Sequence, residues 1–153
     1  MAYQLFLNKK PSILLEDLVY TANMGRTHLN YRIGFIVNSL EDLGAQLRQG
    51  NFMTGKSSSD KKITIEFSYV TKGDFEISTE AAEMEKVIIN IGPEIHWKEF
   101  FEKLRLFYLE GARIDWSGLY KPFNFEVQTI PDYPFQSTHF WAEFLEKNGF
   151  DKK

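Results

Sequence analysis

Apolar residues recur at three- and four-residue intervals in three stretches of the chain, and this spacing predicts three helices. The first helix begins after Ser12, a favoured N-cap residue, and ends at Gly25. The second covers residues 40–49, and the third, which is the longest, covers residues 94–110. Acidic residues near the start and a glycine just past the end of each stretch support these limits.

Other stretches predict strands and connections. Residues 32–37 and 87–91 are short apolar runs rich in β-branched side chains, which are typical of mostly buried strands. Residues 63–69 alternate apolar and polar positions, so we expect a strand with one solvated face. The small polar residues 50–61 predict a mobile loop, and residues 78–86 predict a short helical stretch.

Helices and strands in this order predict an α+β fold of two α/β layers, with a small three-stranded sheet flanked by helices. From Ile114 onward the periodicity is lost, and aromatic residues and prolines indicate an extended C-terminal segment. We therefore expect a single structural unit with two parts. Residues 1–113 form the α/β domain, and residues 114–153 form an extended segment that packs on this domain or on a partner.

Composition and charge exclude some classes of function. The 153 residues are 43% hydrophobic and 25% charged, as in an ordinary globular domain. The net charge of −3 and the lack of clustered lysine and arginine argue against nucleic-acid binding, which requires a basic patch. No apolar run is long enough to span a membrane, so we expect no membrane partner and a cytoplasmic location.

The chain offers few residues for catalysis or metal binding. It has no cysteine, which excludes thiolate nucleophiles and thiolate metal sites. Ser117 precedes a glycine but lacks the first glycine of a G-x-S-x-G turn. The three histidines, His28, His96 and His139, are far apart in the sequence and form no metal-binding pair. We therefore expect no catalytic residue, no metal and no cofactor.

Two separated parts of the chain carry recognisable motifs. Residues 15–32 read LEDLVYTANMGRTHLNYR, and after the predicted strand residues 39–43 read SLEDL. Residues 109–120 read LEGARIDWSGLY, and residues 130–135 read IPDYPF before a Phe-Trp pair. Together and in this order, these motifs resemble the segments that flank ketosynthase domains in modular polyketide synthases.

The resemblance implies a function without catalysis. It implies a scaffold or docking domain that abuts the ketosynthase domain of its own synthase and receives a free-standing acyltransferase. The acyl carrier protein is a further partner in this interpretation. Family positions that we expect to serve as structural motif residues are Tyr20, Gly25, Arg26, His28, Arg32, Asp115, Trp116 and Tyr120.

The resemblance also implies roles for particular residues. Gly25 is expected to end the first helix at positive φ, and Arg26 to reach a cluster of carboxylates or carbonyls. The closing motifs supply candidates for an interface, with packing on the domain itself as the alternative. These candidates are Pro131, Tyr133, Pro134, Phe135, Phe140 and Trp141.

The unmatched middle of the chain bears on the type of synthase. A built-in acyltransferase would lie between the two motif-bearing parts, but only about 45 residues separate Gln49 from Glu94, too few for such a domain. The resemblance therefore implies a trans-acyltransferase synthase or an engineered deletion of the acyltransferase. The chain departs from the family pattern at Asp132, which replaces a threonine, and at residues 125–127, where an Arg-Arg pair is usual. A purely structural ketosynthase linker and an enzyme acting on acyl thioesters remain as alternative functions.

Overall fold

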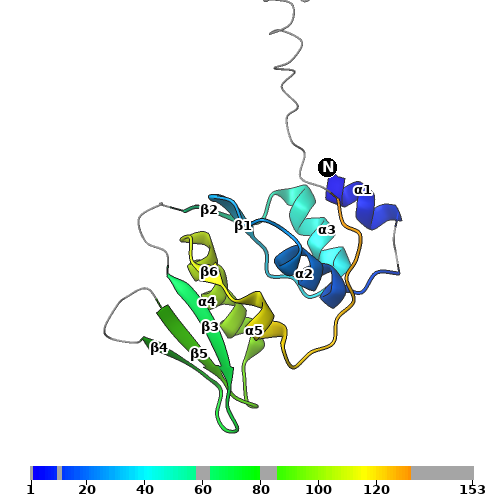
Figure 1. Cartoon of the computed structure of the whole chain (residues 1–153). Helices are drawn as coiled ribbons and strands as arrows, with labels where there is room; N and C mark the ends of the chain where they lie inside the picture. The colour runs from blue at the N-terminus through cyan, green and yellow to red at the C-terminus, as the bar shows by residue number, and fades with distance from the viewer. Residues whose placement is uncertain (1, 10–11, 58–62, 80–85, 132–153) are drawn as a thin grey trace, which may run out of the picture.

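The computed structural model describes residues 2–9, 12–57, 63–79 and 86–131 (Figure 1). These ranges contain five helices and six strands. In chain order they are α1 (Ala2–Lys9), α2 (Leu15–Met24), β1 (Tyr31–Gly34), α3 (Leu40–Gln49), β2 (Met53–Lys56), β3 (Thr64–Tyr69), β4 (Phe75–Thr79), β5 (Lys86–Ile91), α4 (Trp97–Leu109), β6 (Arg113–Ile114) and α5 (Trp116–Tyr120).

The strands form two sheets within the described part of the chain. The larger sheet has the order β4-β5-β3-β6, in which β3 is parallel to β5 and β6, and β4 is antiparallel to β5. β1 and β2 pair antiparallel as a separate ribbon. Small sheets flanked by helices confirm the α+β fold. The predicted single three-stranded sheet is wrong, because β1 belongs to the ribbon while β4 and β6 extend the larger sheet.

β4 occupies the place where the sequence predicted the start of a short helix. Gly73, with φ 85°, forms the turn that precedes this strand. From Phe75 to Ser78 apolar and polar side chains alternate, which suits a strand at the edge of a sheet. The rest of the predicted helix, residues 80–85, lies outside the described residues.

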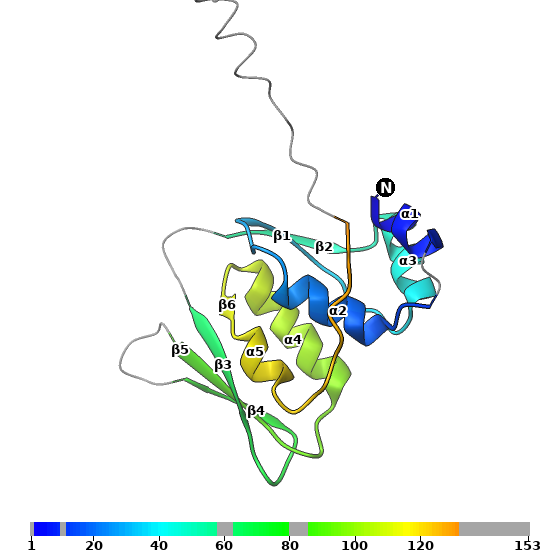
Figure 2. The same ribbon diagram turned by 45° about the vertical axis from the view of Figure 1, so that its right-hand side comes forward.

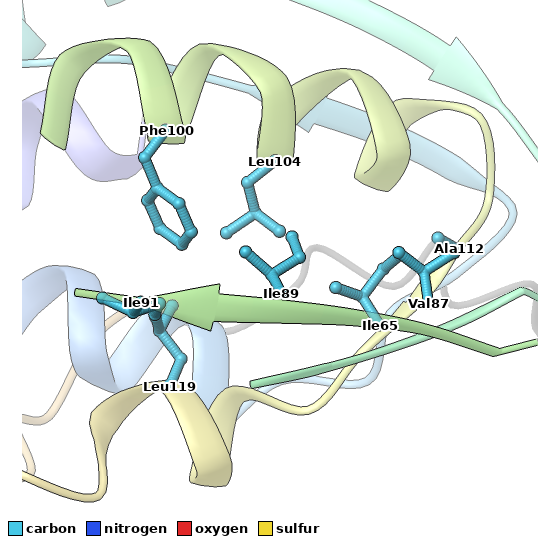
Figure 3. Packing of buried hydrophobic residues seen from close by; sticks show 8 residues of the cluster. All are labelled: Ile65, Val87, Ile89, Ile91, Phe100, Leu104, Ala112 and Leu119. Carbon is cyan, nitrogen blue, oxygen red and sulfur yellow. The ribbon is translucent and has the colours of Figure 1, made fainter. Parts of the chain in front are cut away.

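The main hydrophobic core lies between the larger sheet and the helices α4 and α5 (Figure 3). The register places Ile65 beside Val87, so side chains of β3 and β5 point to the same face. Phe100 and Leu104 of α4 and Leu119 of α5 pack onto this face. The buried members are Ile65, Val87, Ile89, Ile91, Phe100, Leu104, Ala112 and Leu119.

The opposite face of the larger sheet is largely polar, with Ile88 among its residues. By the register, Glu66 and Ser68 of β3 share this face with Lys86 and Asn90 of β5. Lys86 Nζ lies 2.9 Å from Glu66 Oε2, and both side chains are partly exposed. This arrangement fits the solvated face that the alternating pattern of β3 predicts.

A second hydrophobic cluster joins the helices near the amino terminus. Ile13, Leu18 and Ile130 are its buried members. Leu7 of α1 and Leu43 of α3 pack against them. Ile130 comes from the far end of the described chain, so this cluster binds the closing segment to the first helices.

The β1–β2 ribbon lies against α4 and differs from the sequence prediction in two respects. β2 lies inside residues 50–61, which were predicted to be a mobile loop. β1 is not mostly buried, because Ile33 is 50% exposed while its neighbours Arg32 and Gly34 are buried. A Cβ on Gly55 would lie 2.2 Å from the backbone oxygen of Leu109, so this glycine permits the close approach of ribbon and helix.

Helix ends were predicted well for α3 and less well elsewhere. The hydroxyl of Ser39 accepts a hydrogen bond from the Asp42 amide at 3.1 Å, and Gly50 ends α3 with φ 67°. Ser12 does not cap α2, whose N-cap is Leu14 without a side-chain hydrogen bond.

The long helix begins at Trp97 and not at residue 94. The preceding residues are bound to the turn before β4, since the Glu94 amide donates to the Gly73 carbonyl and the His96 amide to Asp74. These long-range bonds compete with the first helical turn.

The predicted extended segment is wrong over its first residues. It contains Ile114 of β6 and the helix α5, which Asp115 caps by accepting a hydrogen bond from the Gly118 amide at 3.1 Å. Short side-chain caps of this kind can start a helix without an apolar period. After a turn at Lys121 and Pro122, residues 123–131 have no regular secondary structure, and they run along α2 (Figure 2).

Candidate functional site

The two motif-bearing parts of the sequence pack against each other in the structure. Tyr20 of α2 meets Tyr120 of α5 edge to face, with ring centroids 5.3 Å apart. The Asn23 side-chain amide donates to the Tyr120 hydroxyl at 2.6 Å. Phe125 contacts both tyrosine rings, at 5.5 and 5.6 Å. These aromatic contacts join helices that are nearly 100 residues apart in the chain.

His28 connects α2 to α4 and α5. Its Nε2 lies 2.8 Å from the Asn23 carbonyl oxygen, which can only accept, so this nitrogen donates. Its Nδ1 lies 2.9 Å from the Tyr108 hydroxyl and accepts from it in the neutral ring. The ring also lies 6.0 Å from the Trp116 ring. Both ring nitrogens are therefore engaged in holding the fold.

Arg32 is buried and is surrounded by backbone oxygens. Its Nη1 donates to the carbonyls of Tyr108 at 2.8 Å and Ala112 at 2.6 Å, and its Nε donates to the Leu29 carbonyl at 3.1 Å. The guanidinium carbon also lies 4.7 Å from the centre of the Tyr108 ring. The Tyr108 carbonyl lies in the last turn of α4 and the Ala112 carbonyl follows it, so this side chain supplies donors where the helix ends.

Gly25 ends α2, as predicted, but not at positive φ. Its φ is −94°, which is accessible to any residue. Its amide donates to the Thr21 carbonyl at 2.8 Å, and an added Cβ would lie 2.8 Å from that same oxygen. A side chain at position 25 is therefore disfavoured because it would collide with the last turn of α2.

A segment that we call the strap, residues 121–131, is bound to α2 through its backbone. The Glu126 amide donates to the buried Asp17 carboxylate at 2.8 Å, and the Gln128 amide donates to the Thr21 hydroxyl at 2.9 Å. Arg26 fulfils the prediction that it reaches carbonyls. Its Nη2 donates to the oxygens of Ile130 at 2.9 Å and Pro131 at 2.5 Å.

The candidate interface residues divide into two groups. Pro131 lies on the strap, where its carbonyl accepts from Arg26. The other candidates lie outside the described residues. They are Tyr133, Pro134, Phe135, Phe140 and Trp141.

The hydroxyls of Tyr108 and Tyr120 are held in the neutral form. Burial raises the pKa of Tyr120 to about 12, despite the hydrogen bond from Asn23 that opposes the shift. Burial also raises the pKa of Tyr108, against the opposing charge of Arg32. Hydroxyls with raised pKa values are poor bases at neutral pH and suit a structural role as hydrogen-bond partners.

An exposed aromatic surface lies at the end of the molecule where β3 and β5 finish. Trp97 stacks on Phe101, with ring centroids 5.6 Å apart, and meets Phe123 at 6.1 Å. All three rings are more than a third exposed. Phe123 in turn stacks on Phe125 at 5.6 Å, which connects this surface to the tyrosine pair.

A hollow of about 310 Å³ adjoins this surface. Its lining comes from the ends of β3 and β5 and from the start of α4. The residues are Tyr69, Val70, Ile91, Gly92, Pro93, Ile95 and Trp97. Its walls are mostly apolar, and Tyr69 uses its hydroxyl to donate to the Leu119 carbonyl.

Comparison with known proteins places this geometry in context. The chain is 32% identical over 130 residues to polyketide synthase PksN of Bacillus subtilis (strain 168), which covers 84% of the chain and 2% of that protein. It is 27% identical over 148 residues to PksL and 26% over 142 residues to PksR of the same organism, covering 92% and 91% of the chain. It is related to polyketide synthases.

The match to these synthases is a match to a small part of each. The chain spans 2%, 3% and 5% of PksN, PksL and PksR. A family model described as CurL-like, PKS C-terminal matches residues 1–47, which include α1, α2, β1 and most of α3. The resemblance read from the motifs is thus confirmed as far as a polyketide-synthase segment.

Neither a metal centre nor a membrane span is found in the described part of the chain. It contains no group of three or more His, Asp or Glu side chains that could hold a metal ion. None of its helices is both long and apolar enough to cross a membrane.

Four residues that take part in these contacts were not among the site residues predicted from the sequence. Asp17 and Thr21 bind the strap, and Asn23 and Tyr108 supply partners to Tyr120 and His28. The spacing of Asp17 and Thr21 at i and i+4 places both on one helical face, which was a usable signal. Tyr108 gave no such signal, because it reads as an ordinary member of an apolar helical face.

Proposed function

We propose that this chain is a non-catalytic docking module of a polyketide synthase of the trans-acyltransferase type. It positions a free-standing acyltransferase next to the ketosynthase domain and the acyl carrier protein. The relation to polyketide synthases supports a role in such a synthase. The fold of the middle segment supports the trans-acyltransferase type.

The observation that carries the proposal is that the residues between the two motif-bearing parts contribute strands and core side chains to the fold. The segment from Gly50 to Glu94 supplies β2, β3, β4 and β5. Ile65, Val87 and Ile89 from this segment are buried in the main core. The middle of the chain is therefore part of one small fold and not the remnant of an inserted catalytic domain. A scaffold of this kind leaves acyl loading to a separate protein.

The motif residues support a scaffold in a second way. His28, Arg32 and Tyr120 make hydrogen bonds between parts of the chain that are far apart in sequence, and Asp115 caps α5. These contacts support a structural role for the motif side chains. Exposed surfaces would then make the contacts with other molecules.

The docking role is tested by titrating the chain with a free-standing acyltransferase of the same biosynthetic system in a calorimeter. We expect saturable binding with a Kd on the order of 1–10 µM, as weak protein interfaces show. Absence of binding at 100-fold higher concentration would leave the purely structural ketosynthase linker as the function.

The non-catalytic role is tested separately with acyl thioesters. Purified chain is incubated with acyl-coenzyme A and with acylated carrier protein, and release or transfer of the acyl group is followed by mass spectrometry. We expect the uncatalysed rate. Turnover that a single substitution such as Ser117→Ala abolishes would identify an enzyme.

A further inference from the structure

Two connections of the larger sheet meet beside the hollow. Residues 70–74, which we call the β3–β4 turn, join β3 to β4, and because β5 lies between these strands, the turn crosses the carboxyl end of β5. The chain leaves β5 at the same place and reaches α4 through residues 92–96. Segments that serve different strands are therefore brought together at one end of the sheet.

Every second amide of residues 92–96 binds the β3–β4 turn. The Gly92 amide donates to the Asp74 carbonyl at 2.5 Å, and the Glu94 amide donates to the Gly73 carbonyl at 2.9 Å. The His96 amide donates to the Asp74 carboxylate at 2.8 Å. These three bonds hold the turn against the segment that leads into α4.

The outermost of the three bonds differs from the other two, because it involves side chains that titrate. His96 Nδ1 lies 2.7 Å from Oδ2 of Asp74, whose Oδ1 accepts from the His96 amide. The hydrogen bond with Asp74 raises the pKa of His96 above 6.5, and the same bond lowers the pKa of Asp74 below 3.8. The bonds of Gly92 and Glu94 join backbone atoms only and have no charge to lose.

The other charged residues around this pair come from the turn and from the start of α4. They are Lys72, Glu94, Lys98 and Glu99. Glu99 raises the pKa of His96 as Asp74 does, but by less. The contribution of charged His96 is complete below its unfolded pKa and disappears as pH rises through the folded value, while that of Asp74 disappears as pH falls through its own folded value. Both groups are therefore charged only between the two folded values.

Both connected segments contribute to the lining of the hollow. Tyr69 and Val70 lie where β3 passes into the turn, and Ile95 and Trp97 flank His96 in the chain. All four residues line the hollow. Movement of the turn relative to the start of α4 therefore changes the shape of this depression.

We propose that the His96–Asp74 pair is a pH-sensitive clamp that sets how closely the β3–β4 turn is held to the start of α4, and with it the shape of the hollow. When both groups are charged, the turn is held at its outer end by an ion pair and a hydrogen bond. When His96 loses its proton, the ion pair is lost and the turn opens more often. Because the pair is exposed, the change falls on local opening and not on the stability of the whole fold. This inference does not depend on the docking function.

Hydrogen exchange at the Glu94 amide tests the clamp, because this amide donates to the turn next to the titrating pair. Protection factors, which correct for the effect of pH on the intrinsic exchange rate, are measured by NMR at about pH 5.5 and about pH 8.5. Titration of the His96 ring protons in the same samples confirms that the ring is charged at the lower pH and neutral at the higher. We expect protection of Glu94 to be about threefold lower at the higher pH. The Asp115 amide, which donates to the Ile65 carbonyl, is the control and should keep its protection.

Two variants distinguish a titrating clamp from a bond with a fixed structural role. Asp74→Asn keeps an acceptor for the His96 amide but removes the charge, and His96→Gln keeps the amide but cannot be protonated. We expect both variants to show the lower protection of Glu94 at both pH values. Glu99→Gln leaves the three bonds in place and should retain the change with pH. The melting temperature of each variant is measured alongside to confirm that it is folded.

The methyl signals of Val70 report on the hollow, and they should shift with the same midpoint as the His96 ring. Protection of Glu94 that stays constant while His96 titrates would show that the pair is an ordinary surface contact. A change with pH that persists in His96→Gln would assign it to another group and overturn the clamp. Val70 signals that do not follow the His96 midpoint would contradict the link to the hollow.

Discussion

Single side chains at the junction of α2, α4 and α5 make hydrogen bonds that the sequence motifs did not predict in detail. Arg32 is the clearest case, because a positive charge is buried among three carbonyl oxygens and has no carboxylate partner among the residues that the structure describes. A planar guanidinium can donate in several directions at once, whereas an ammonium group presents a compact charge. The identity of this residue is therefore set by geometry as well as by charge.

Arg32→Lys is expected to destabilise the domain. Lysine retains the charge but cannot donate to the Leu29, Tyr108 and Ala112 carbonyls together, and we expect a loss of about 2–3 kcal/mol in the free energy of unfolding. Urea unfolding followed by circular dichroism measures the change. Arg113→Lys, at an exposed site, is the control and should change stability by less than about 0.5 kcal/mol. Equal stability of both variants would show that charge alone is sufficient at Arg32.

The pair of His96 and Asp74 at the start of α4 has a pH dependence that can be measured directly. The hydrogen bond and charge of Asp74 raise the pKa of His96 above 6.5, and His96 lowers the pKa of Asp74 below 3.8. The His96 contribution is present below its unfolded pKa and is lost as pH rises through the folded value. The Asp74 contribution is present above its unfolded pKa and is lost as pH falls through the folded value. The pair is therefore formed between the two folded pKa values.

Titration of the His96 ring protons by NMR is expected to give a midpoint above 6.5. Asp74→Asn should bring this midpoint back toward 6.5, because the main cause of the shift is removed. Glu99→Gln, which removes a smaller contribution, should lower it less. A midpoint that Asp74→Asn leaves unchanged would contradict the pairing.

At the scale of elements, α2 organises the domain by binding a segment from the other end of the chain. Asp17, Thr21 and Arg26 all bind the backbone of the strap, so the strap is held without regard to most of its side chains. Ile130, which enters the amino-terminal cluster, and Phe125, which contacts the Tyr20 and Tyr120 rings, add side-chain contacts. This explains how a strap of low periodicity can have a fixed path along a helix.

Thr21→Val is expected to loosen the strap while leaving α2 intact. Valine has a similar shape but cannot accept from the Gln128 amide, and an unpaired amide costs about 1–2 kcal/mol. Hydrogen exchange should become roughly tenfold faster at Gln128 and faster at Glu126. Thr27→Val, at an exposed position between the motif residues, should leave both amides unchanged. Faster hydrogen exchange at the amides of α2 alone would instead indicate that the substitution damages the helix.

At the scale of the whole molecule, two hydrophobic clusters are joined by the contacts between the motif-bearing parts. One cluster lies on the larger sheet and the other among α1, α2 and α3. Tyr20, His28 and Arg32 connect the helical part to α4 and α5. These partly buried contacts couple the two clusters, so neither is expected to melt on its own.

The chain is expected to unfold in a single transition. Leu18→Ala in one cluster and Leu104→Ala in the other should each cost about 2–5 kcal/mol and shift the same transition. Calorimetry together with near-UV circular dichroism measures this. Two separated transitions, each sensitive to only one substitution, would show that the clusters are independent units.

The sequence by itself determined the α+β class, the body of α2, α3 and α4, and the relation to polyketide synthases. These follow from helical periodicity, from cap residues such as Ser39, and from motifs that are local in the chain. Local patterns also revealed β3 and β5, because their apolar residues are consecutive or alternate regularly.

Only the tertiary structure decided how these parts combine. The sheet order, the start of α4 at Trp97, the conformation of Gly25 and the hollow beside Trp97 depend on contacts between residues far apart in sequence. β4 and α5 were missed for a related reason, since a short edge strand and a side-chain-capped turn carry too few residues to establish a period. The free energy of these features comes from distant partners, which the order of residues does not reveal locally.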